Sequence, residues 1–448
     1  MRNIIHNSSF TIQNMNLLLN QSIVSHLELV EGHNSQLSLT GSKSETNRLL
    51  LLQALYPNIT LENSSLSDDS EVMAKALSSN EKIIDVDHAG TAMRFLTAYF
   101  AIQQNREVIL TGSSRMKERP IKILVDALRQ LGANISYVEK EGFPPIKIIG
   151  QNITQDTVQL KADVSSQYIS ALLLIAPKLK NGLKLSLKGE ITSLPYIKMT
   201  LALLEKMGVA TSFIGNKIIV KPLVTLSPVE GQQFIIESDW SSASYFYSIV
   251  ALSPKGTQLE LSSFQEGSLQ GDKILVEIYA NFGVETVFKN GSIIIKKIEN
   301  RAKTIHLNLL QSPDIAQTLV VTCFGLGVGC YLKGLHTLKI KETDRLVSMK
   351  TELTKLGASV LIGNDSLSLG SSTKIKSDIA ISTYQDHRMA MAFAPLALKV
   401  ALTIKDAEVV SKSYPTFWKD LKTIGFKIKD KVSKKNARKA VSQNPLKK

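Results

Sequence analysis

One pattern of apolar and polar positions recurs along the chain: a helical stretch, a glycine, and then a strand-like run. Apolar residues at i, i+3 and i+4 predict amphipathic helices, and a glycine after each helix can take the positive φ of a C′ position. Five copies occupy residues 124–138, 201–214, 275–288, 349–362 and 417–430, with Gly132, Gly208, Gly283, Gly357 and Gly425 as their glycines. Successive glycines lie about 75 residues apart, which indicates an internal repeat.

A sixth copy lies one period before the first, where Leu49–Leu61 contains a helical stretch, Pro57 as turn residue and a strand-like end. A unit of this length holds about two helices and four short strands. Six units account for nearly all of the 448 residues, which are too many for one core. We therefore predict a mixed α/β (α+β) protein with two similar domains of three units each.

Composition is typical of a soluble globular protein, with 44% apolar and 21% charged residues. No stretch approaches the ~18 apolar residues of a membrane span and no secretory signal is evident, so we expect a cytoplasmic protein with no membrane partner. Cys323 and Cys330 lie in an apolar run, which favours small buried side chains and excludes a disulfide framework. The seven histidines are scattered, so we expect no metal and no cofactor.

The net charge of +14 indicates an anionic partner, but the charge is unevenly distributed. Residues 431–448 contain seven basic residues and no acidic one, and so carry half of the excess. They lack aromatic residues and a sustained apolar period, which favours a solvated, flexible tail. A tail that binds nucleic acid is the alternative, and we favour a protein with no nucleic-acid partner.

Several segments place cations and hydroxyl groups where a predicted helix begins. In Gly41–Arg48 (GSKSETNR) the chain turns at Gly41, and Lys43 and Arg48 add charge to the free amides of the helix start. Similar groups occur in residues 88–94 (HAGTAMR), 114–121 (SRMKERPI), 165–168 (SSQY) and 237–246 (ESDWSSASYF). Such groups suit phosphate oxygens, although N-capping and solvated turns explain any single segment equally well.

The second half of the chain adds Lys341–Arg345 (KETDR), 386–393 (DHRMAMAF) and 412–418 (KSYPTFW). On a helix surface KETDR would be an ordinary mixed-charge turn. Taken in order from about Gly41 to Gly425, the eight segments resemble the signatures of the EPSP synthase (3-phosphoshikimate 1-carboxyvinyltransferase) family of enolpyruvyl transferases. One segment alone is a weak signal, whereas the ordered set is specific.

The resemblance implies an inside-out α/β barrel of two domains, each built from three βαββαβ units. We expect residues 1–41 with 237–429 to form one domain, residues 42–236 the other, and residues 430–448 a basic tail. The implied reaction transfers the enolpyruvyl group of phosphoenolpyruvate to the 5-hydroxyl of shikimate 3-phosphate, in the biosynthesis of chorismate and aromatic amino acids. These small molecules are the expected partners of a monomer.

The matched motifs also imply the site residues. Those expected to bind shikimate 3-phosphate are Lys43, Ser44, Arg48, Ser165, Ser166, Gln167, Ser193, Tyr196, Asp314 and Lys341. Those expected to bind phosphoenolpyruvate are Lys43, Gly90, Arg119, Gln167, Arg345, Arg388 and Lys412. By the same resemblance Asp314 accepts the hydroxyl proton, Glu342 protonates the methylene and Lys43 completes the catalytic set. Carboxylates in such opposed roles need different environments.

Three residues depart from the family pattern. His88 stands where Asn or Asp is usual, Phe95 where Pro is usual, and Thr337 where some members have Asn. None of them removes a proposed catalytic group, so we expect effects on substrate affinity more than on activity.

Two other functions stay open. UDP-N-acetylglucosamine enolpyruvyl transferases share the fold and the co-substrate, but many use a cysteine on a loop of the first-half domain. Here Cys323 and Cys330 both come late, in an apolar run. The second alternative, a basic nucleic-acid-binding protein, depends on the tail alone. The presence of Lys43, Asp314 and Glu342 argues against a third possibility, a catalytically inactive relative.

Overall fold

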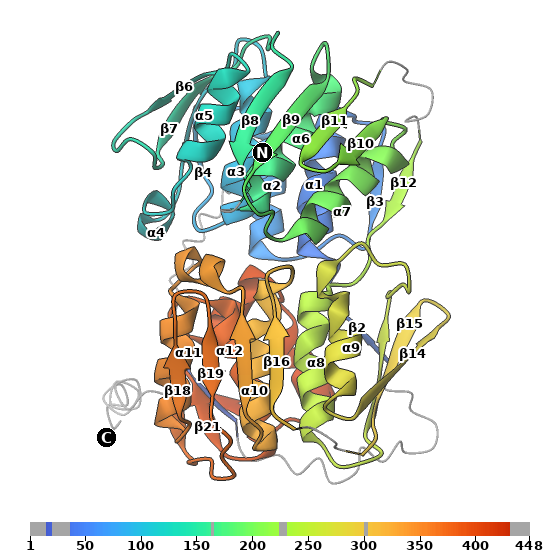
Figure 1. Ribbon diagram of the computed structural model, residues 1–448, viewed down its shortest axis with the longest axis vertical. Coiled ribbons are helices and arrows are strands. Elements are labelled where there is room, and N and C mark those ends of the chain that lie inside the picture. Colours follow the sequence, from blue (N-terminus) through green and yellow to red (C-terminus); the bar gives the residue numbers. More distant parts are fainter. Residues whose placement is uncertain (1–14, 20–35, 163–164, 224–230, 300–302, 431–448) are drawn as a thin grey trace, which may run out of the picture.

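Two hydrophobic cores divide the molecule. The computed structural model describes residues 15–19, 36–162, 165–223, 231–299 and 303–430. Buried residues between Leu49 and Ile236 form the core of the upper domain in Figure 1. Leu17, Leu19, Leu37 and Leu39 join buried residues between Trp240 and Phe426 in the core of the lower domain. The domain boundaries predicted at residues 42 and 236 stay a prediction. Of the predicted tail, residues 431–448 lie outside the described residues.

The upper domain contains seven α-helices within the described residues. They are α1 (Lys43–Leu55), α2 (Asp68–Ser78), α3 (Gly90–Ala101), α4 (Ser114–Lys117), α5 (Lys122–Gln130), α6 (Ser166–Ile175) and α7 (Leu194–Lys206). Its strands are β3 (Thr60–Glu62), β4 (Ile83–Asp85), β5 (Glu107–Thr111), β6 (Asn134–Tyr137), β7 (Ile146–Ile149), β8 (Thr157–Lys161), β9 (Leu183–Lys188), β10 (Thr211–Ile214), β11 (Lys217–Val220) and β12 (Gln233–Ile235).

The lower domain takes its first two strands from the start of the chain. Its helices are α8 (Trp240–Leu252), α9 (Leu275–Ala280), α10 (Ala316–Leu326), α11 (Arg345–Lys355), α12 (His387–Phe393) and α13 (Phe417–Thr423). Its strands are β1 (Leu17–Leu19), β2 (Gln36–Ser38), β13 (Gln258–Ser262), β14 (Val284–Lys289), β15 (Ser292–Lys297), β16 (Ile305–Asn308), β17 (Cys330–Lys333), β18 (Val360–Ile362), β19 (Leu367–Leu369), β20 (Ile379–Ile381), β21 (Leu402–Ile404) and β22 (Ile428–Asp430). None of the described helices is long and apolar enough to cross a membrane.

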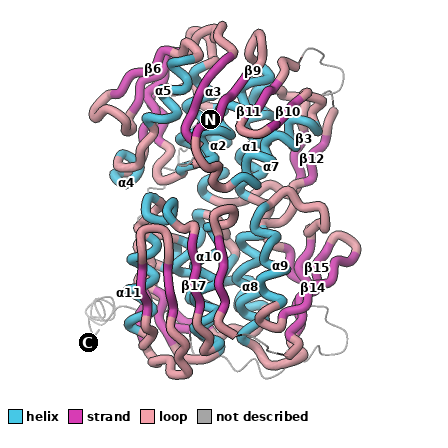
Figure 2. Tube along the Cα trace, in the orientation of Figure 1, coloured by secondary structure: helices cyan, strands magenta, loops and turns pink. Residues whose placement is uncertain are grey.

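The predicted repeat is visible in the sheets (Figure 2). Five sheets have four strands, in the orders β4-β5-β7-β6, β10-β11-β9-β8, β14-β15-β13-β2, β16-β17-β19-β18 and β20-β21-β1-β22, and β12 pairs with β3 alone. In the first of these units β4 and β5 are parallel, whereas β7 runs antiparallel to both β5 and β6. The order in this unit is β-α-β-α-α-β-β when the short helix α4 is counted, whereas the expected unit is βαββαβ. The five predicted glycines all have positive φ, as C′ residues require.

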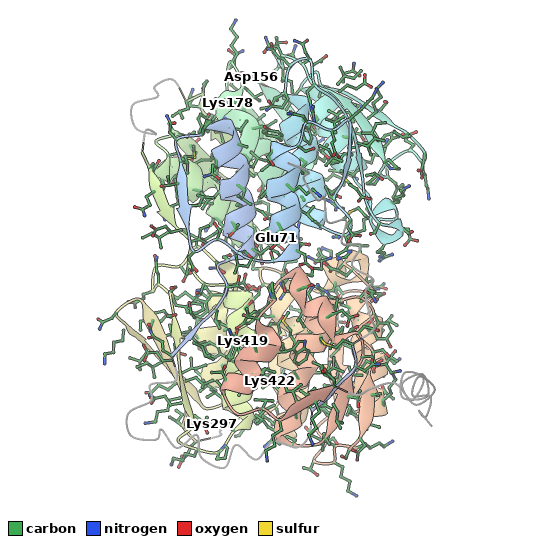
Figure 3. All side chains as sticks on the ribbon, turned by 180° about the vertical axis from the view of Figure 1, so that it is seen from behind. Glu71, Asp156, Lys178, Lys297, Lys419 and Lys422 are labelled. Carbon is green, nitrogen blue, oxygen red and sulfur yellow. The ribbon has the colours of Figure 1, made fainter. Side chains whose placement is uncertain are left out.

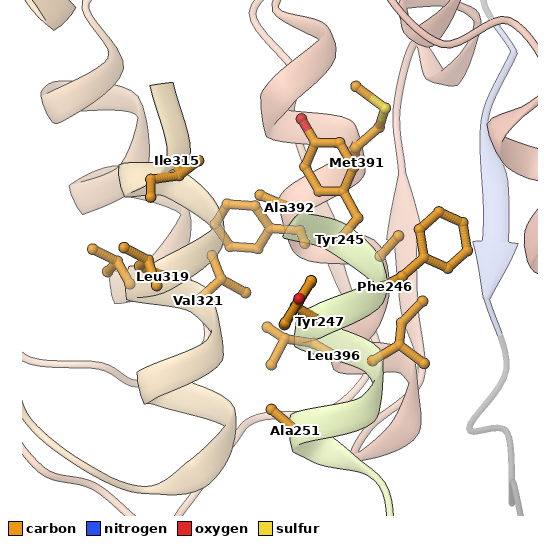
Figure 4. Close-up of a cluster of buried hydrophobic side chains, with 14 of the residues drawn as sticks. Tyr245, Phe246, Tyr247, Ala251, Ile315, Leu319, Val321, Met391, Ala392 and Leu396 are labelled. Atoms are coloured by element: carbon orange, nitrogen blue, oxygen red, sulfur yellow. The ribbon is translucent and has the colours of Figure 1, made fainter. Parts of the chain in front are cut away.

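Three central helices in each domain lie inside the sheets. All seven residues of α12 are buried, and α6 and α8 are buried along nearly their whole length. A helix that is apolar on every side must be covered on every side, which explains this inside-out arrangement. Figure 4 shows the lower core, where Tyr245 and Phe246 of α8 lie among Leu319, Val321, Met391 and Ala392 of α10 and α12. Charged side chains such as Asp156 and Lys422 lie on the outer surfaces (Figure 3).

The two domains are joined where the chain crosses between them twice. Gly41 and Ser238 form an antiparallel bridge, and the Ser42 amide donates to the Glu237 carbonyl at 2.8 Å. A Cβ at Gly41 would lie 1.8 Å from the Asn63 carbonyl oxygen, so only glycine allows this close approach. Beside the bridge the Glu237 amide donates to Glu45 Oε2 at 3.4 Å. Burial, and then the charge of Glu237, raise the pKa of Glu45 to about 7.

Because the pKa of Glu45 beside Glu237 is raised, the free energy of unfolding depends on pH. Because the pKa of Glu45 is raised from its ordinary value of 4.5, the folded protein binds more protons than the unfolded chain between about pH 4.5 and 7. Stability contributed by this group is present below that window and is lost as pH rises through it. We expect Glu45→Gln to raise the free energy of unfolding by up to about 3 kcal/mol at about pH 8 and much less at about pH 4.5, as measured by urea denaturation.

The matched control is Glu71→Gln, on the exposed side of α2 (Figure 3). It should change the free energy of unfolding by no more than about 0.5 kcal/mol at either pH. Equal effects of Glu45→Gln at both pH values would contradict the argument.

Candidate active site

The starts of all six central helices line one pocket between the domains. Lys43 and Ser44 of α1, Gly90 and Thr91 of α3, Ser165 and Ser166 at α6, Ser241 and Ser242 of α8, Asp314 just before α10, and His387 and Arg388 of α12 all border it. Each helix start presents free amides and the positive end of its dipole. Six such ends around one pocket favour a ligand with several negative charges.

All but one of the predicted site residues line this pocket. They are Lys43, Ser44, Arg48, Gly90, Arg119, Ser165, Ser166, Gln167, Ser193, Tyr196, Asp314, Lys341, Glu342, Arg345 and Arg388. The exception is Lys412, which is buried directly behind Glu342. Its Nζ lies 3.2 Å from Glu342 Oε1 and donates to the His88 carbonyl at 3.0 Å, so it also joins the two domains.

Arg345 organises the lower half of the pocket. This guanidinium is only 2% exposed and contacts Asp314 at 3.0 Å, Glu342 at 2.9 Å and Asp386 at 2.6 Å. Asp386 is fully buried and also caps α12 by accepting from the Arg388 amide at 2.9 Å. Because Arg345 is held from three sides, its position is fixed before any ligand arrives.

Cations keep the two candidate catalytic carboxylates ionised. Burial alone would raise the pKa of Asp314, but Lys341, Arg388 and Arg345 together lower it far below its usual range. Lys341 Nζ and Arg388 Nη2 lie 3.4 and 3.3 Å from its oxygens. Burial would likewise raise the pKa of Glu342, yet Lys412, Arg345 and Arg119 lower it well below its usual value. Without a bound ligand, both side chains are therefore carboxylates.

The upper half of the pocket holds Arg48 between two rings. Its guanidinium carbon lies 5.4 Å from the ring centroid of Phe95 and 5.8 Å from that of Tyr196. Nε donates to Thr200 Oγ1 at 2.8 Å and Nη2 to Ser170 Oγ at 3.0 Å. Burial lowers the pKa of Arg48 to about 10, so it remains a cation at neutral pH.

Arg119 and Lys43 complete the upper wall. A Cβ at Gly90 would lie 2.6 Å from Arg119 Nη1, so the glycine makes room for this guanidinium. Lys43 Nζ lies 3.0 Å from Asp69, whose side chain is 5% exposed. The Asp69 carboxylate of α2 thus holds the Lys43 side chain at the N-terminus of α1.

Sequence reasoning missed Asp69 and His387 as site residues. Asp69 gave no signal, because DDSE at the start of α2 reads as an ordinary acidic first turn. His387 was inside a matched motif, but only Arg388 was assigned there. Burial, followed by the charge of Lys43, lowers the pKa of His387 well below its usual value, so the ring is neutral. Neither ring nitrogen has a hydrogen-bond partner among the described side chains and backbone.

Each of the three departures from the family pattern lies in the pocket wall or contacts a residue of the site. His88 Nδ1 lies 3.0 Å from Asp87, and its carbonyl accepts from Lys412. Phe95 is fully buried and carries Arg48 on its face. Thr337 lines the pocket. Each position therefore touches or supports a cation or the pocket wall.

The fold is that of solved enolpyruvyl transferases. EPSP synthase from Acinetobacter baumannii superposes with a TM-score of 0.72 at 20% identity, covering 93% of this chain and 100% of that one. The enolpyruvyl transferase NikO from Streptomyces tendae gives 0.68 at 13% identity, covering 94% and 100%. At these identities the likeness to solved structures shows the fold alone. It confirms the predicted α/β fold class.

Sequence comparison places the chain within this class. The family model described as EPSP synthase (3-phosphoshikimate 1-carboxyvinyltransferase) matches residues 75–421. The 3-phosphoshikimate 1-carboxyvinyltransferase of Bacteroides fragilis (strain YCH46) is 47% identical over 397 residues, covering 88% of this chain and 96% of the relative. That of Vibrio cholerae serotype O1 (strain M66-2) is 36% identical over 420 residues, with the same coverage. The chain belongs to the EPSP synthase family, as predicted.

The burial of Asp386 predicts a large loss of stability when its charge is removed. Asp386→Asn keeps the shape but deprives buried Arg345 of its 2.6 Å partner, and we expect a loss of about 3 kcal/mol in the free energy of unfolding. Urea denaturation measures it. Exposed Asp365→Asn is the control, expected to stay within about 0.5 kcal/mol. A loss below about 1 kcal/mol for Asp386→Asn would show that Arg345 does not depend on this pair.

Proposed function

We propose that this protein transfers the enolpyruvyl group of phosphoenolpyruvate to the 5-hydroxyl of shikimate 3-phosphate, giving 5-enolpyruvylshikimate 3-phosphate and phosphate. One observation carries the proposal: cations from both domains, together with six helix starts, surround a single pocket. Both substrates carry several negative charges, which such a pocket suits. The names of the relatives from Bacteroides fragilis and Vibrio cholerae support the same reaction.

The two halves of the pocket suit different parts of the substrates. Arg48, with Ser165 and Ser166 at the start of α6, offers a cation and hydroxyl donors to the phosphate of shikimate 3-phosphate. Arg119 and Arg345 face the pocket from opposite domains and offer guanidinium charge to the carboxylate and phosphate of phosphoenolpyruvate. Binding of both substrates would therefore draw on both domains.

The reaction is an addition followed by an elimination. The 5-hydroxyl oxygen bonds to C2 of phosphoenolpyruvate as its proton is removed, and C3 takes up a proton. The resulting methyl group then loses a proton while the bond from C2 to the phosphate oxygen breaks, which restores the double bond. We assign removal of the hydroxyl proton to Asp314 and protonation of C3 to Glu342, and we include Lys43 in the catalytic set.

The charge state of the free site shapes these roles. Glu342 is ionised without substrates, because its pKa is held low by Lys412, Arg345 and Arg119. Bound phosphate and carboxylate groups would neutralise those cations and so raise the pKa of Glu342 toward the range in which it can donate a proton. The same neutralisation of Lys341 and Arg388 would make Asp314 a stronger base. We infer that the substrates themselves activate the two carboxylates.

The remaining proposals concern the whole chain. We propose a cytoplasmic monomer with a first domain of residues 1–41 and 237–429 and a second of residues 42–236, acting in chorismate and aromatic amino acid biosynthesis. The rival substrate, UDP-N-acetylglucosamine, is disfavoured because Cys323 and Cys330 are buried in the lower core and neither lines the pocket.

Phosphate release from the purified protein tests the function. We expect release only when phosphoenolpyruvate and shikimate 3-phosphate are both present. Release with UDP-N-acetylglucosamine in place of shikimate 3-phosphate would show that the protein has the rival function.

Removal of residues 431–448 tests whether the basic tail matters for the reaction. Loss of heparin retention with unchanged turnover would show that the tail carries the excess charge and that the enzyme does not need it.

Removing charge from the proposed catalytic set should slow turnover strongly. We expect Glu342→Gln and Lys43→Met each to lower kcat at least ~100-fold, on the scale usual for acid–base groups. Steady-state phosphate release at saturating substrates measures kcat, and far-UV circular dichroism checks the fold. Exposed Glu71→Gln should retain the wild-type rate. A near-normal rate in Glu342→Gln would show that Glu342 does not carry out the proton transfer assigned to it.

A further inference from the structure

One side chain outside the pocket connects two loops that line it. Gln311, in the lower domain, accepts from the Leu194 amide at 2.7 Å and donates to the Ile191 carbonyl at 3.4 Å. Next to it the Ser193 amide donates to the Leu310 carbonyl at 3.2 Å. These three bonds join the loop before α7 to the segment before α10. They cross from one domain to the other.

The loop held by Gln311 has a backbone that needs support. Ser193 adopts φ 53° and ψ 42°, a left-handed conformation that a non-glycine residue rarely takes. Leu194 is the first residue of α7, and its amide has no partner within its own helix. The Gln311 carbonyl oxygen supplies that partner, so an amide from the opposite domain caps α7.

Residues on both sides of the Gln311 contact line the pocket. On the upper side Thr192, Ser193 and Tyr196 line the pocket, and the Tyr196 carbonyl accepts from Arg48 at 3.2 Å. On the lower side Asp314 follows Gln311 by three residues and also lines the pocket. Gln311 itself is not among the residues that line it.

Close packing around Gln311 restricts the position of the loop before α7. A Cβ at Gly271 would lie 2.5 Å from the Cβ of Pro195, so the lower domain approaches the start of α7 closely. Ser312, next to Gln311, donates to the Gly271 carbonyl at 3.1 Å. The Gln311 contact is therefore part of a close interdomain interface.

We propose that Gln311 is a positioning residue for shikimate 3-phosphate, which holds the phosphate-side loop, residues 191–196, in register with the segment that carries Asp314. The inference rests on the proposed function. Only a side chain with both a donor and an acceptor at this length can satisfy the Leu194 amide and the Ile191 carbonyl together. Its effect should appear in binding of shikimate 3-phosphate, because phosphoenolpyruvate is assigned to Gly90, Arg119 and Arg345.

Gln311→Met tests the proposal, since methionine has similar length but neither group. We expect the dissociation constant for shikimate 3-phosphate, measured by calorimetry on the full-length chain, to rise about tenfold through loss of two hydrogen bonds. The KM for phosphoenolpyruvate should stay within about twofold, which a general loss of structure would not allow. Gln311→Asn keeps the amide on a shorter side chain and should weaken binding too, so it replaces Gln311→Met if that variant fails to fold.

Gln53→Met is the matched control, because Gln53 Nε2 donates to the Ile59 carbonyl at 2.8 Å within the upper domain alone. It should leave both substrate constants unchanged. An unchanged dissociation constant in Gln311→Met or in Gln311→Asn, with an active wild type, overturns the role of Gln311 while the proposed function stands. A wild-type protein that neither binds shikimate 3-phosphate nor releases phosphate overturns both.

Discussion

The central helices of both domains are buried along most of their length, and this constraint decides where function can lie. A helix covered on every side offers a ligand nothing but its ends. The sequence of α12 illustrates this: Met389, Ala390, Met391 and Ala392 fill the lower core, while His387 and Arg388 at its start reach the pocket. The same division holds for α1, α3, α6 and α8. Core and site are therefore different parts of the same helices.

Six helix starts in one place create a strong positive potential, which the protein must tolerate before its substrates arrive. Arg345 contributes to this balance because it is buried with three carboxylates, Asp314, Glu342 and Asp386. These acids neutralise part of the charge in the free protein. In the proposed reaction, anionic substrates compete with the acids for the same cations, which would raise the pKa values of Asp314 and Glu342. The cations proposed to bind the substrates would thus also set the proton affinity of the two carboxylates.

Much of this structure could be predicted from local sequence rules. The five glycines with positive φ followed from helix periodicity, and all but one of the site residues implied by the family resemblance line the pocket. What escaped prediction depends on contacts between distant segments. Asp69 reaches Lys43 only because α2 packs beside α1, and Lys412 lies between Glu342 and the His88 carbonyl of the other domain. The order of strands within a unit likewise depends on pairing, which periodicity does not encode.

The site is divided between two domains, so its geometry depends on the contacts that cross between them. At the junction, Gly41 and Ser238 bring the two crossings of the chain together, and Glu45 and Glu237 are buried beside them. At the pocket, Lys412 reaches His88, and Gln311 reaches residues 191–194. The lower half carries Asp314 and Glu342, the carboxylates proposed for proton transfer, whereas Lys43 and Arg119 come from the upper half. Anionic substrates would contact cations of both halves at once, so binding energy and domain contact would reinforce each other.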